Sequence, residues 1–159
     1  MLDIDLQLKL LIQERPWEHE PDREEWVHEL TGYKCTVRRH QTLGSLNGYV
    51  AIPKGHRVWG IFYDKAPLEN IEVHGGLTYA DEDKETGEWV LGFDCSHGGD
   101  FSPRLLANIM RFSSHEDLET MLELKLRTEV YRTFEWVNKE VCVLARQLKM
   151  LDMKGKWNE

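Results

Sequence analysis

The strongest structural signal in this sequence is a regular series of apolar residues near its C-terminal end. Between about Thr128 and Met153 they recur in alternating steps of four and three, at Val130, Phe134, Val137, Val141, Leu144, Leu148 and Leu151. Such spacing brings side chains to one face of an α-helix, so it predicts a long amphipathic helix. We favour packing of that face on the rest of the chain, which is its commoner use. The alternative is a homodimer in which two copies pair through this helix.

The pattern changes twice before this helix. Helical spacing of leucines and capping residues predict N-terminal helices within residues 1–32, one ended by Pro16 and a second over residues 21–30. Alternating β-branched and aromatic residues predict short strands within residues 33–103, and C-terminal helices occupy residues 113–153. Helices at both ends of hairpin-linked strands indicate one α+β domain over residues 1–159, with a short, largely antiparallel sheet.

Charge and cysteine usage limit the classes of partner. The formal charge is −8, from 28 acidic and 20 basic residues, which argues against binding to duplex nucleic acid. The three cysteines are far apart without a CxxC spacing, which predicts a reducing compartment and no thiolate zinc site. The N-terminal segment lacks the pattern of a signal peptide, and no apolar run approaches the ~20 residues that cross a bilayer. We therefore expect a soluble cytoplasmic protein with no membrane partner.

One predicted hairpin, over residues 71–96, carries the densest group of chemically active side chains. Alternation assigns Tyr79 to the core side together with Trp89. If Ala80 and Glu88 close the loop, His74 lies opposite Asp94, and two glycines face each other beside them. Facing glycines mark a place where a ligand or another backbone approaches closely. A second histidine and aspartate, His97 and Asp100, follow at the end of the second strand.

Two kinds of chemistry fit this group. As metal ligands, its imidazole nitrogens and carboxylate oxygens suit a divalent zinc, manganese or iron ion. Without a metal, a histidine oriented by an aspartate is a general acid or base near neutral pH, and glycine amides can hold a phosphate. Any one of these residues alone is better explained by ordinary hydrogen bonding or backbone conformation. Their gathering on one hairpin favours a catalytic or metal site made of His74, Asp94, His97 and Asp100, with phosphate-binding glycines Gly75, Gly76, Gly98 and Gly99.

Residues outside the hairpin extend this candidate site. Arg38 and Arg39 belong to a local basic patch that can bind an anion, although a solvated strand end explains it equally well. Tyr49 can stack on a base, His56 can reach the same cleft, and Thr78 lines its floor. The ligand we expect is therefore a small molecule that contains phosphate.

Several motifs resemble a group of small phage and prophage proteins. The pattern shared by that group runs GYV, then HGGLTY, then GFDC-x-H-x-GD. Here the corresponding stretches are GYVAIPKGH from residue 48, VHGGLTY from residue 73 and GFDCSHGGD from residue 92, with YRTFEWVNKEV in the last helix. This chain departs from the pattern at Asn47, where many relatives have Cys, and at Val90, where a second Trp is common. The resemblance implies a phage-associated protein that acts in host takeover, nucleotide metabolism or counter-defence within the bacterial cytoplasm.

Three functions follow from these features. The leading hypothesis is a small phosphoesterase-like hydrolase of a nucleotide-like or other phosphorylated molecule, in which Asp94 orients His74 and Asp100 pairs with His97. The second is a non-catalytic binder that sequesters a nucleotide through the same pocket. The third is an inhibitor of a host protein that acts through its acidic surface and its long helix.

Overall fold

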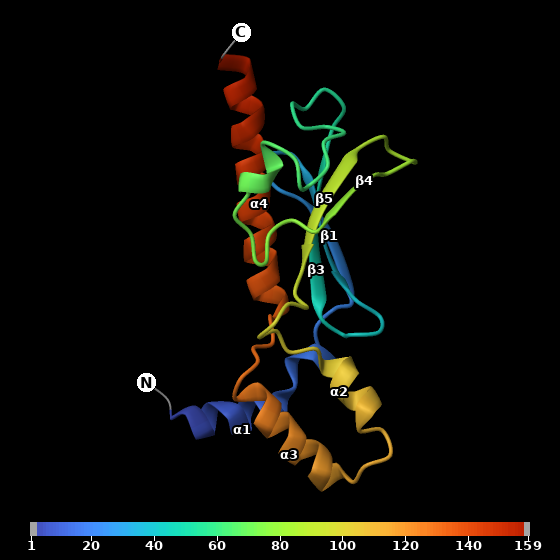
Figure 1. Cartoon of the computed structure of the whole chain (residues 1–159), viewed down its shortest axis with the longest axis vertical. Helices are drawn as coiled ribbons and strands as arrows, with labels where there is room; N and C mark the ends of the chain where they lie inside the picture. Colours follow the sequence, from blue (N-terminus) through green and yellow to red (C-terminus); the bar gives the residue numbers. More distant parts are fainter. Residues whose placement is uncertain (1–2, 158–159) are drawn as a thin grey trace.

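The computed structural model describes residues 3–157 and confirms the predicted α+β class. Its helices and strands follow in the order α1 (Ile4–Glu14), β1 (Arg23–Val27), β2 (Lys34–Arg39), β3 (Leu46–Ile52), β4 (Tyr79–Glu82), β5 (Trp89–Asp94), α2 (Pro103–Ile109), α3 (His115–Leu126) and α4 (Phe134–Trp157). The five strands form one antiparallel sheet in the order β1-β2-β3-β5-β4. Figure 1 shows α4 along one face of this sheet, and no helix within residues 3–157 covers the other face.

Helix α4 supplies the apolar side chains that pack against the sheet to form the main core. Its seam residues Val137, Val141, Leu144 and Leu148 are completely buried against the sheet. Gly48 of β3 permits this close approach, because a Cβ at that position would lie 2.5 Å from Cγ2 of Val141. The apolar seam is therefore packed within the chain, as favoured, and pairing of two copies through this helix stays a prediction.

The long helix begins later than the apolar spacing predicts. Val130 is half exposed and forms an isolated parallel bridge with Asp100. The helix starts only after Thr133, whose Oγ1 accepts a hydrogen bond from the amide of Trp136 at 3.2 Å. A capping side chain and a backbone pairing thus override the helical spacing at Val130.

The helix predicted over residues 21–30 is wrong. Residues Arg23–Val27 form strand β1, which pairs with β2 in a register that places Arg23 opposite Arg38 and Trp26 opposite Cys35. Trp26 packs against the main core from this edge strand. Capping residues at Asp22 and Glu25 suggested a helix locally, but pairing with a neighbouring strand decides the outcome.

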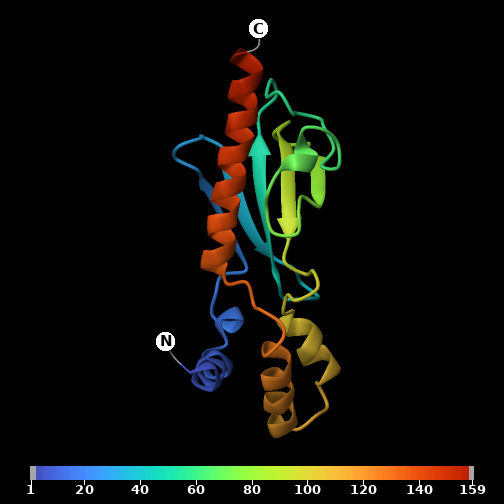
Figure 2. The same ribbon diagram turned by 60° about the vertical axis from the view of Figure 1, so that its left-hand side comes forward.

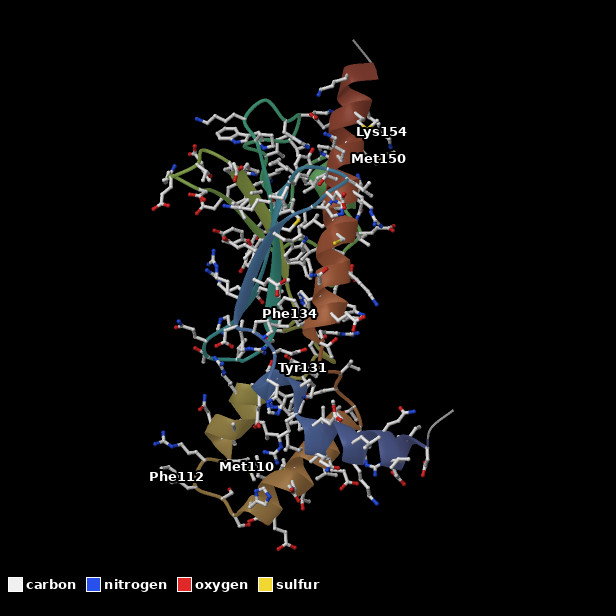
Figure 3. All side chains as sticks on the ribbon, turned by 180° about the vertical axis from the view of Figure 1, so that it is seen from behind. Met110, Phe112, Tyr131, Phe134, Met150 and Lys154 are labelled. Carbon is white, nitrogen blue, oxygen red and sulfur yellow. The ribbon has the colours of Figure 1, made fainter. Side chains whose placement is uncertain are left out.

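Helices α1, α2 and α3 lie together at one end of the sheet (Figures 1 and 2), where they enclose a second apolar cluster. Its buried members are Leu8, Phe101, Leu106, Leu122, Leu126 and Tyr131. Figure 3 places Tyr131 and Phe134 at the junction between this helical end and the sheet. The junction is fixed by Arg39, whose buried guanidinium donates to the Tyr131 hydroxyl at 2.9 Å, to the Gly44 carbonyl at 2.8 Å and to Asp22 at 2.8 Å.

Candidate functional site

The hairpin has a different register from the one predicted. Tyr79 lies opposite Gly92 and Glu82 lies opposite Trp89, a shift of three residues. Because the shift is odd, Tyr79 moves from the core side to the outer face of the sheet. Residues 71–78 form no strand; they turn at Gly75 and Gly76, so His74 does not lie opposite Asp94.

The structure nevertheless brings the four ionisable residues together, with their partners exchanged. His74 Nε2 lies 2.7 Å from Oδ2 of Asp100, and His97 Nε2 lies 3.3 Å from Oδ1 of Asp94. The two imidazole rings meet edge to face with their centroids 5.6 Å apart. The predicted pairs, His74 with Asp94 and His97 with Asp100, are therefore wrong, although the grouping itself is present.

Asp100 is the most deeply buried member of the group, with 1% of its side chain exposed. It accepts hydrogen bonds from His74, from Nε of Arg132 at 3.1 Å and from the amide of His97 at 3.0 Å. Burial alone would raise the pKa of Asp100, but these donors outweigh burial and bring the pKa below its ordinary value. The Arg132 guanidinium also lies over the ring of Trp136, which packs edge to face on His74.

This arrangement leaves one histidine nitrogen available for chemistry. An Nε2–H tautomer of His74 donates to Asp100, so Nδ1 keeps its lone pair, and no hydrogen-bond partner for Nδ1 occurs within residues 3–157. An imidazole oriented in this way can act as a general base. The side chain of His74 is only 19% exposed, so access to Nδ1 is restricted.

Asp94 lies at the other side of the group. It accepts hydrogen bonds from the Thr78 hydroxyl at 2.8 Å, the Ser96 hydroxyl at 2.8 Å and the Ser96 amide at 3.1 Å. Burial would raise the pKa of Asp94, yet the bonds from Ser96 and Thr78 lower it below the ordinary value. His97 lies within ion-pair distance of Asp94 but not in hydrogen-bond geometry, so its buried Nε2 has no hydrogen-bond partner in the described chain.

The glycines serve the backbone of the site. Gly75 has a φ of +69°, and a Cβ there would lie 2.1 Å from Nε2 of His97, so only glycine lets His97 occupy its position. The amide of Gly76 closes a turn by donating to the Val73 carbonyl at 2.8 Å, so it is not free to bind phosphate. Gly98 and Gly99 lie within the turn that the amide of Asp100 closes on the His97 carbonyl.

The geometry does not support a metal centre. Within residues 3–157 no three His, Cys, Asp or Glu side chains are placed so that they could hold a metal ion. Each imidazole of the group faces one carboxylate, and Asp100 is already occupied by Arg132.

Two further predicted ligand residues have structural roles instead. His56 is buried: its Nδ1 accepts from the Val58 amide at 3.1 Å, and its Nε2 donates to the Leu148 carbonyl at 2.9 Å. Burial lowers the pKa of His56, which favours this neutral form. Arg39 is fully engaged at the junction described above. His56 therefore has no access to a ligand, and the Arg39 side chain, which is 1% exposed, serves the junction although Arg39 also borders a hollow on the outer face of the sheet.

Arg38, Tyr49 and Thr78 belong to a different surface, the outer face of the sheet. Strand pairing aligns Thr36, Tyr49, Gly92 and Tyr79 in one row, and Arg23, Arg38, Asn47 and Asp94 in the row beside it. The Tyr49 ring lies over Gly92, where a Cβ would be 2.5 Å from its Cδ1, and meets Tyr79 edge to face at 5.4 Å. This open face therefore presents two tyrosines beside two opposed arginines.

Three hollows on this face share lining residues and form one continuous surface, here called the outer groove. The lysine hollow, about 140 Å³, is lined by Lys34, Thr36, Arg38, Tyr49 and Tyr79 among others. The arginine hollow, about 530 Å³, is lined by Asp22, Arg23, Arg38, His40, Asn47 and Arg104 among others. The aspartate hollow, about 280 Å³, is lined by His40, Asn47, Tyr49, Thr78, Tyr79, Asp94 and Ser96 among others.

Arg38 differs from the other cations of the outer groove. Arg23 pairs with Glu25, Arg104 lies 3.5 Å from Asp22, and Lys34 lies 3.9 Å from Glu88. Arg38 is exposed, and no carboxylate of the described residues lies within ion-pair distance of it. Its guanidinium lies over the Tyr49 ring, 5.4 Å from the centroid, and donates to the Tyr49 hydroxyl at 3.4 Å.

The sequence alone indicates only part of the outer groove. Alternation along β2 already places Lys34, Thr36 and Arg38 on one face, and Tyr49 follows on β3. It does not reveal Tyr79, whose face depends on the hairpin register, or Arg104, which joins the groove from α2.

No family model, curated protein or solved structure matches this chain, so no activity comes to it from a relative. The resemblance to phage proteins therefore stays a prediction from the motifs. In the part of the chain that the structure describes, every helix is too short or too polar to span a bilayer.

The depressed pKa of Asp100 predicts an acid-sensitive step in stability. A carboxyl group with a folded pKa below its unfolded value of about 3.8 stabilises the fold above that value, and the contribution is lost as pH falls through the folded pKa. We expect the Asp100→Asn variant to lose less stability than the wild type when urea unfolding is measured from pH 5 down to about pH 2. The exposed Asp64→Asn variant is the control, and equal acid sensitivity of all three proteins would contradict this role.

Proposed function

We propose that this protein binds a phosphorylated, nucleotide-like small molecule in the outer groove. The observation that supports the proposal best is Arg38, a cation that has no carboxylate partner within residues 3–157 and lies beside two tyrosines on an uncovered sheet face. Stacking of a base on an aromatic side chain contributes about 1–3 kcal/mol. A nucleotide is the common small ligand that combines a planar ring with an anion next to it.

The arginine hollow has the chemistry for the phosphate. Arg23 and Arg38 lie directly opposite each other on neighbouring strands, and like charges in that position destabilise a sheet unless an anion lies between them. His40 adds a donor: its Nδ1 accepts from the amides of Thr42 and Leu43, so the proton of the neutral ring is on Nε2. Arg104 lies at the same hollow.

Hydrolysis is the second candidate function. It is favoured by the His74–Asp100 pair, which orients an imidazole whose Nδ1 has no hydrogen-bond partner among the described residues. His97 connects this pair to Asp94 at the end of the aspartate hollow. In that case the outer groove would hold the nucleotide, and His74 would accept a proton from the water that attacks phosphorus while the phosphoester bond to the leaving oxygen breaks. The leading hypothesis from sequence also assigns the role of base to His74. Hydrolysis requires the phosphoester to reach Nδ1 of His74, whose side chain is only 19% exposed. Sequestration does not require this access, so we favour sequestration.

The motif resemblance gives the proposal a context. A phage-associated protein in the bacterial cytoplasm that sequesters a nucleotide can act in counter-defence or nucleotide metabolism.

The third hypothesis, inhibition of a host protein, has less support. The seam of α4 packs on the sheet, and over residues 134–156 the large apolar side chains that α4 leaves exposed are Val143, Met150 and Met153. Figure 3 places Met150 far from the helical end.

The Arg38→Gln variant tests the proposal. Because Arg38 is exposed and its contacts are with Tyr49 rather than with a carboxylate of residues 3–157, the change should leave the fold intact. It should weaken nucleotide binding about tenfold, the effect of losing one hydrogen bond to a charged group. Isothermal titration with GMP and AMP at a fixed salt concentration measures this. Arg111→Gln is the matched control: Arg111 also lies over an aromatic ring, that of Phe112 at 4.7 Å, but at the helical end.

The same samples separate the two candidates. Mass spectrometry of the nucleotide after incubation should return it intact if the protein sequesters it. A hydrolysed product that disappears with His74→Ala would establish the hydrolase instead. If no nucleotide binds to the wild type, or if Arg38→Gln binds as tightly as Arg111→Gln, the outer groove is not the site.

A further inference from the structure

The aspartate hollow contains an unusual pair of hydrogen-bond acceptors. Oδ1 of Asp94 receives the hydroxyl and the amide of Ser96, whereas Oδ2 receives only the hydroxyl of Thr78. A carboxylate offers about four lone-pair sites, so Oδ2 retains one. The Thr78 hydroxyl gives its only proton to Asp94 and retains its own lone pairs. The Thr78 hydroxyl oxygen and Oδ2 of Asp94 therefore lie 2.8 Å apart, and each can still accept a hydrogen bond from a ligand.

A donor stands on the opposite side of Asp94. Asn47 is directly opposite Asp94 on the neighbouring strand, and its Nδ2 donates one proton to the Tyr49 hydroxyl at 3.4 Å. An amide nitrogen carries two protons, so the second is available to a ligand. Because β5 lies between β3 and β4, the groups follow across the sheet as donor, acceptor and acceptor: Asn47, Asp94 and Thr78.

This order is complementary to the pairing edge of one base. Guanine presents a carbonyl acceptor, a ring N–H and an exocyclic amino group, in that order. Adenine would turn a ring nitrogen lone pair toward the Asp94 carboxylate, and the pyrimidines offer no two adjacent donors. The neighbouring rings of Tyr49 and Tyr79 line the same hollow and can stack on the base.

We propose that the aspartate hollow selects guanine, with Asp94 accepting from the ring N–H, Thr78 from the amino group and Asn47 donating to the carbonyl. This inference rests on the proposed function, because the phosphate of the same guanine nucleotide occupies the arginine hollow. Asp94 is open to such a ligand, since 27% of its side chain is exposed. Its role is recognition of the base rather than catalysis.

Titration of the wild type with GMP, IMP and AMP tests the selection, since IMP lacks only the amino group. We expect GMP to bind at least tenfold more tightly than AMP and several-fold more tightly than IMP. The Asp94→Asn variant replaces one acceptor by a donor and should bring GMP and AMP to within about twofold of each other. Asp81→Asn is the control: it makes the same change on β4, on the outer face that also carries Tyr79, and should keep the wild-type preference for GMP.

A second variant tests guanine selection independently in case Asp94→Asn does not fold. Thr78→Val removes the acceptor for the amino group together with the hydrogen bond that the hydroxyl donates to Oδ2 of Asp94, but it keeps the Asp94 carboxylate. It should therefore abolish the difference between GMP and IMP while GMP remains preferred over AMP. Equal affinity of the wild type for all three nucleotides, still weakened by Arg38→Gln, would overturn guanine selection and leave the proposed function standing. Absence of binding by any nucleotide would overturn both.

Discussion

Replacement of Arg39 by methionine is expected to lower the free energy of unfolding by about 3 kcal/mol or more. The guanidinium is 1% exposed and joins the sheet to the helical end through Asp22, Gly44 and Tyr131. Its removal also leaves the Glu20 carboxylate, 3.6 Å away and 16% exposed, without its cation. An uncompensated charge of this kind is among the most costly single changes in a folded protein.

The adjacent residue supplies the control for that prediction. Arg38→Met makes the same chemical change one position along β2, on the exposed face, and should alter stability by less than about 0.5 kcal/mol. Urea unfolding monitored by circular dichroism compares the two variants with the wild type. Equal stability of Arg39→Met and Arg38→Met would show that the junction does not depend on Arg39.

Truncation of Leu144 to alanine has the second large expected effect. The side chain is completely buried between α4 and the sheet, where Leu→Ala changes cost about 2–5 kcal/mol through lost burial and the remaining cavity. Met150→Ala, on the exposed side of the same helix, removes a similar volume and should change stability by less than about 0.5 kcal/mol. Figure 3 shows the position of Met150 on α4.

The same two variants test the use of the apolar seam. If α4 packed on a second copy instead of the sheet, Leu144→Ala would convert a dimer into a stable monomer at low concentration. Packing of α4 on the sheet of its own chain predicts instead a loss of stability that does not depend on protein concentration. Sedimentation at two protein concentrations, made alongside the unfolding measurement, distinguishes these results.

Local periodicity accounts for what the sequence predicts well. The seam of α4 and the alternation in β2 and β3 each depend on residues only a few positions apart, so they can be recognised without knowledge of the fold. Strand β1 is different. Its residues Arg23–Val27 carry helix-capping signals, and only pairing with β2 makes them a strand.

The hairpin register shows why the details of the site escape sequence analysis. The alternation of apolar and polar residues shows which face of a sheet each side chain occupies only where the chain forms a strand. Residues 71–78 are not part of a strand and turn at Gly75. The resulting shift moves Tyr79 to the outer face and exchanges the partners of His74 and His97. The gathering of these histidines and aspartates was predictable from their closeness along one hairpin of the sequence, whereas their pairing was not.

The outer groove draws on residues from separate parts of the chain. Arg38 and Tyr49 were recognisable candidates, because each lies on the polar side of an alternating strand. Arg23 required the correct assignment of β1, and Arg104 required the placement of α2 at the end of the sheet, beside the connection between β2 and β3. Long-range packing of this kind leaves no local periodic signal.

Mapping of the nucleotide by NMR tests the central claim most directly. When GMP is added to isotopically labelled protein, the account predicts that amide resonances of β2, β3 and β5 around Arg38, Tyr49 and Gly92 shift in a saturable way. Resonances around His74 and Asp100 should shift little. Saturable shifts confined to His74 and Asp100, or no shifts at millimolar nucleotide, would contradict binding in the outer groove.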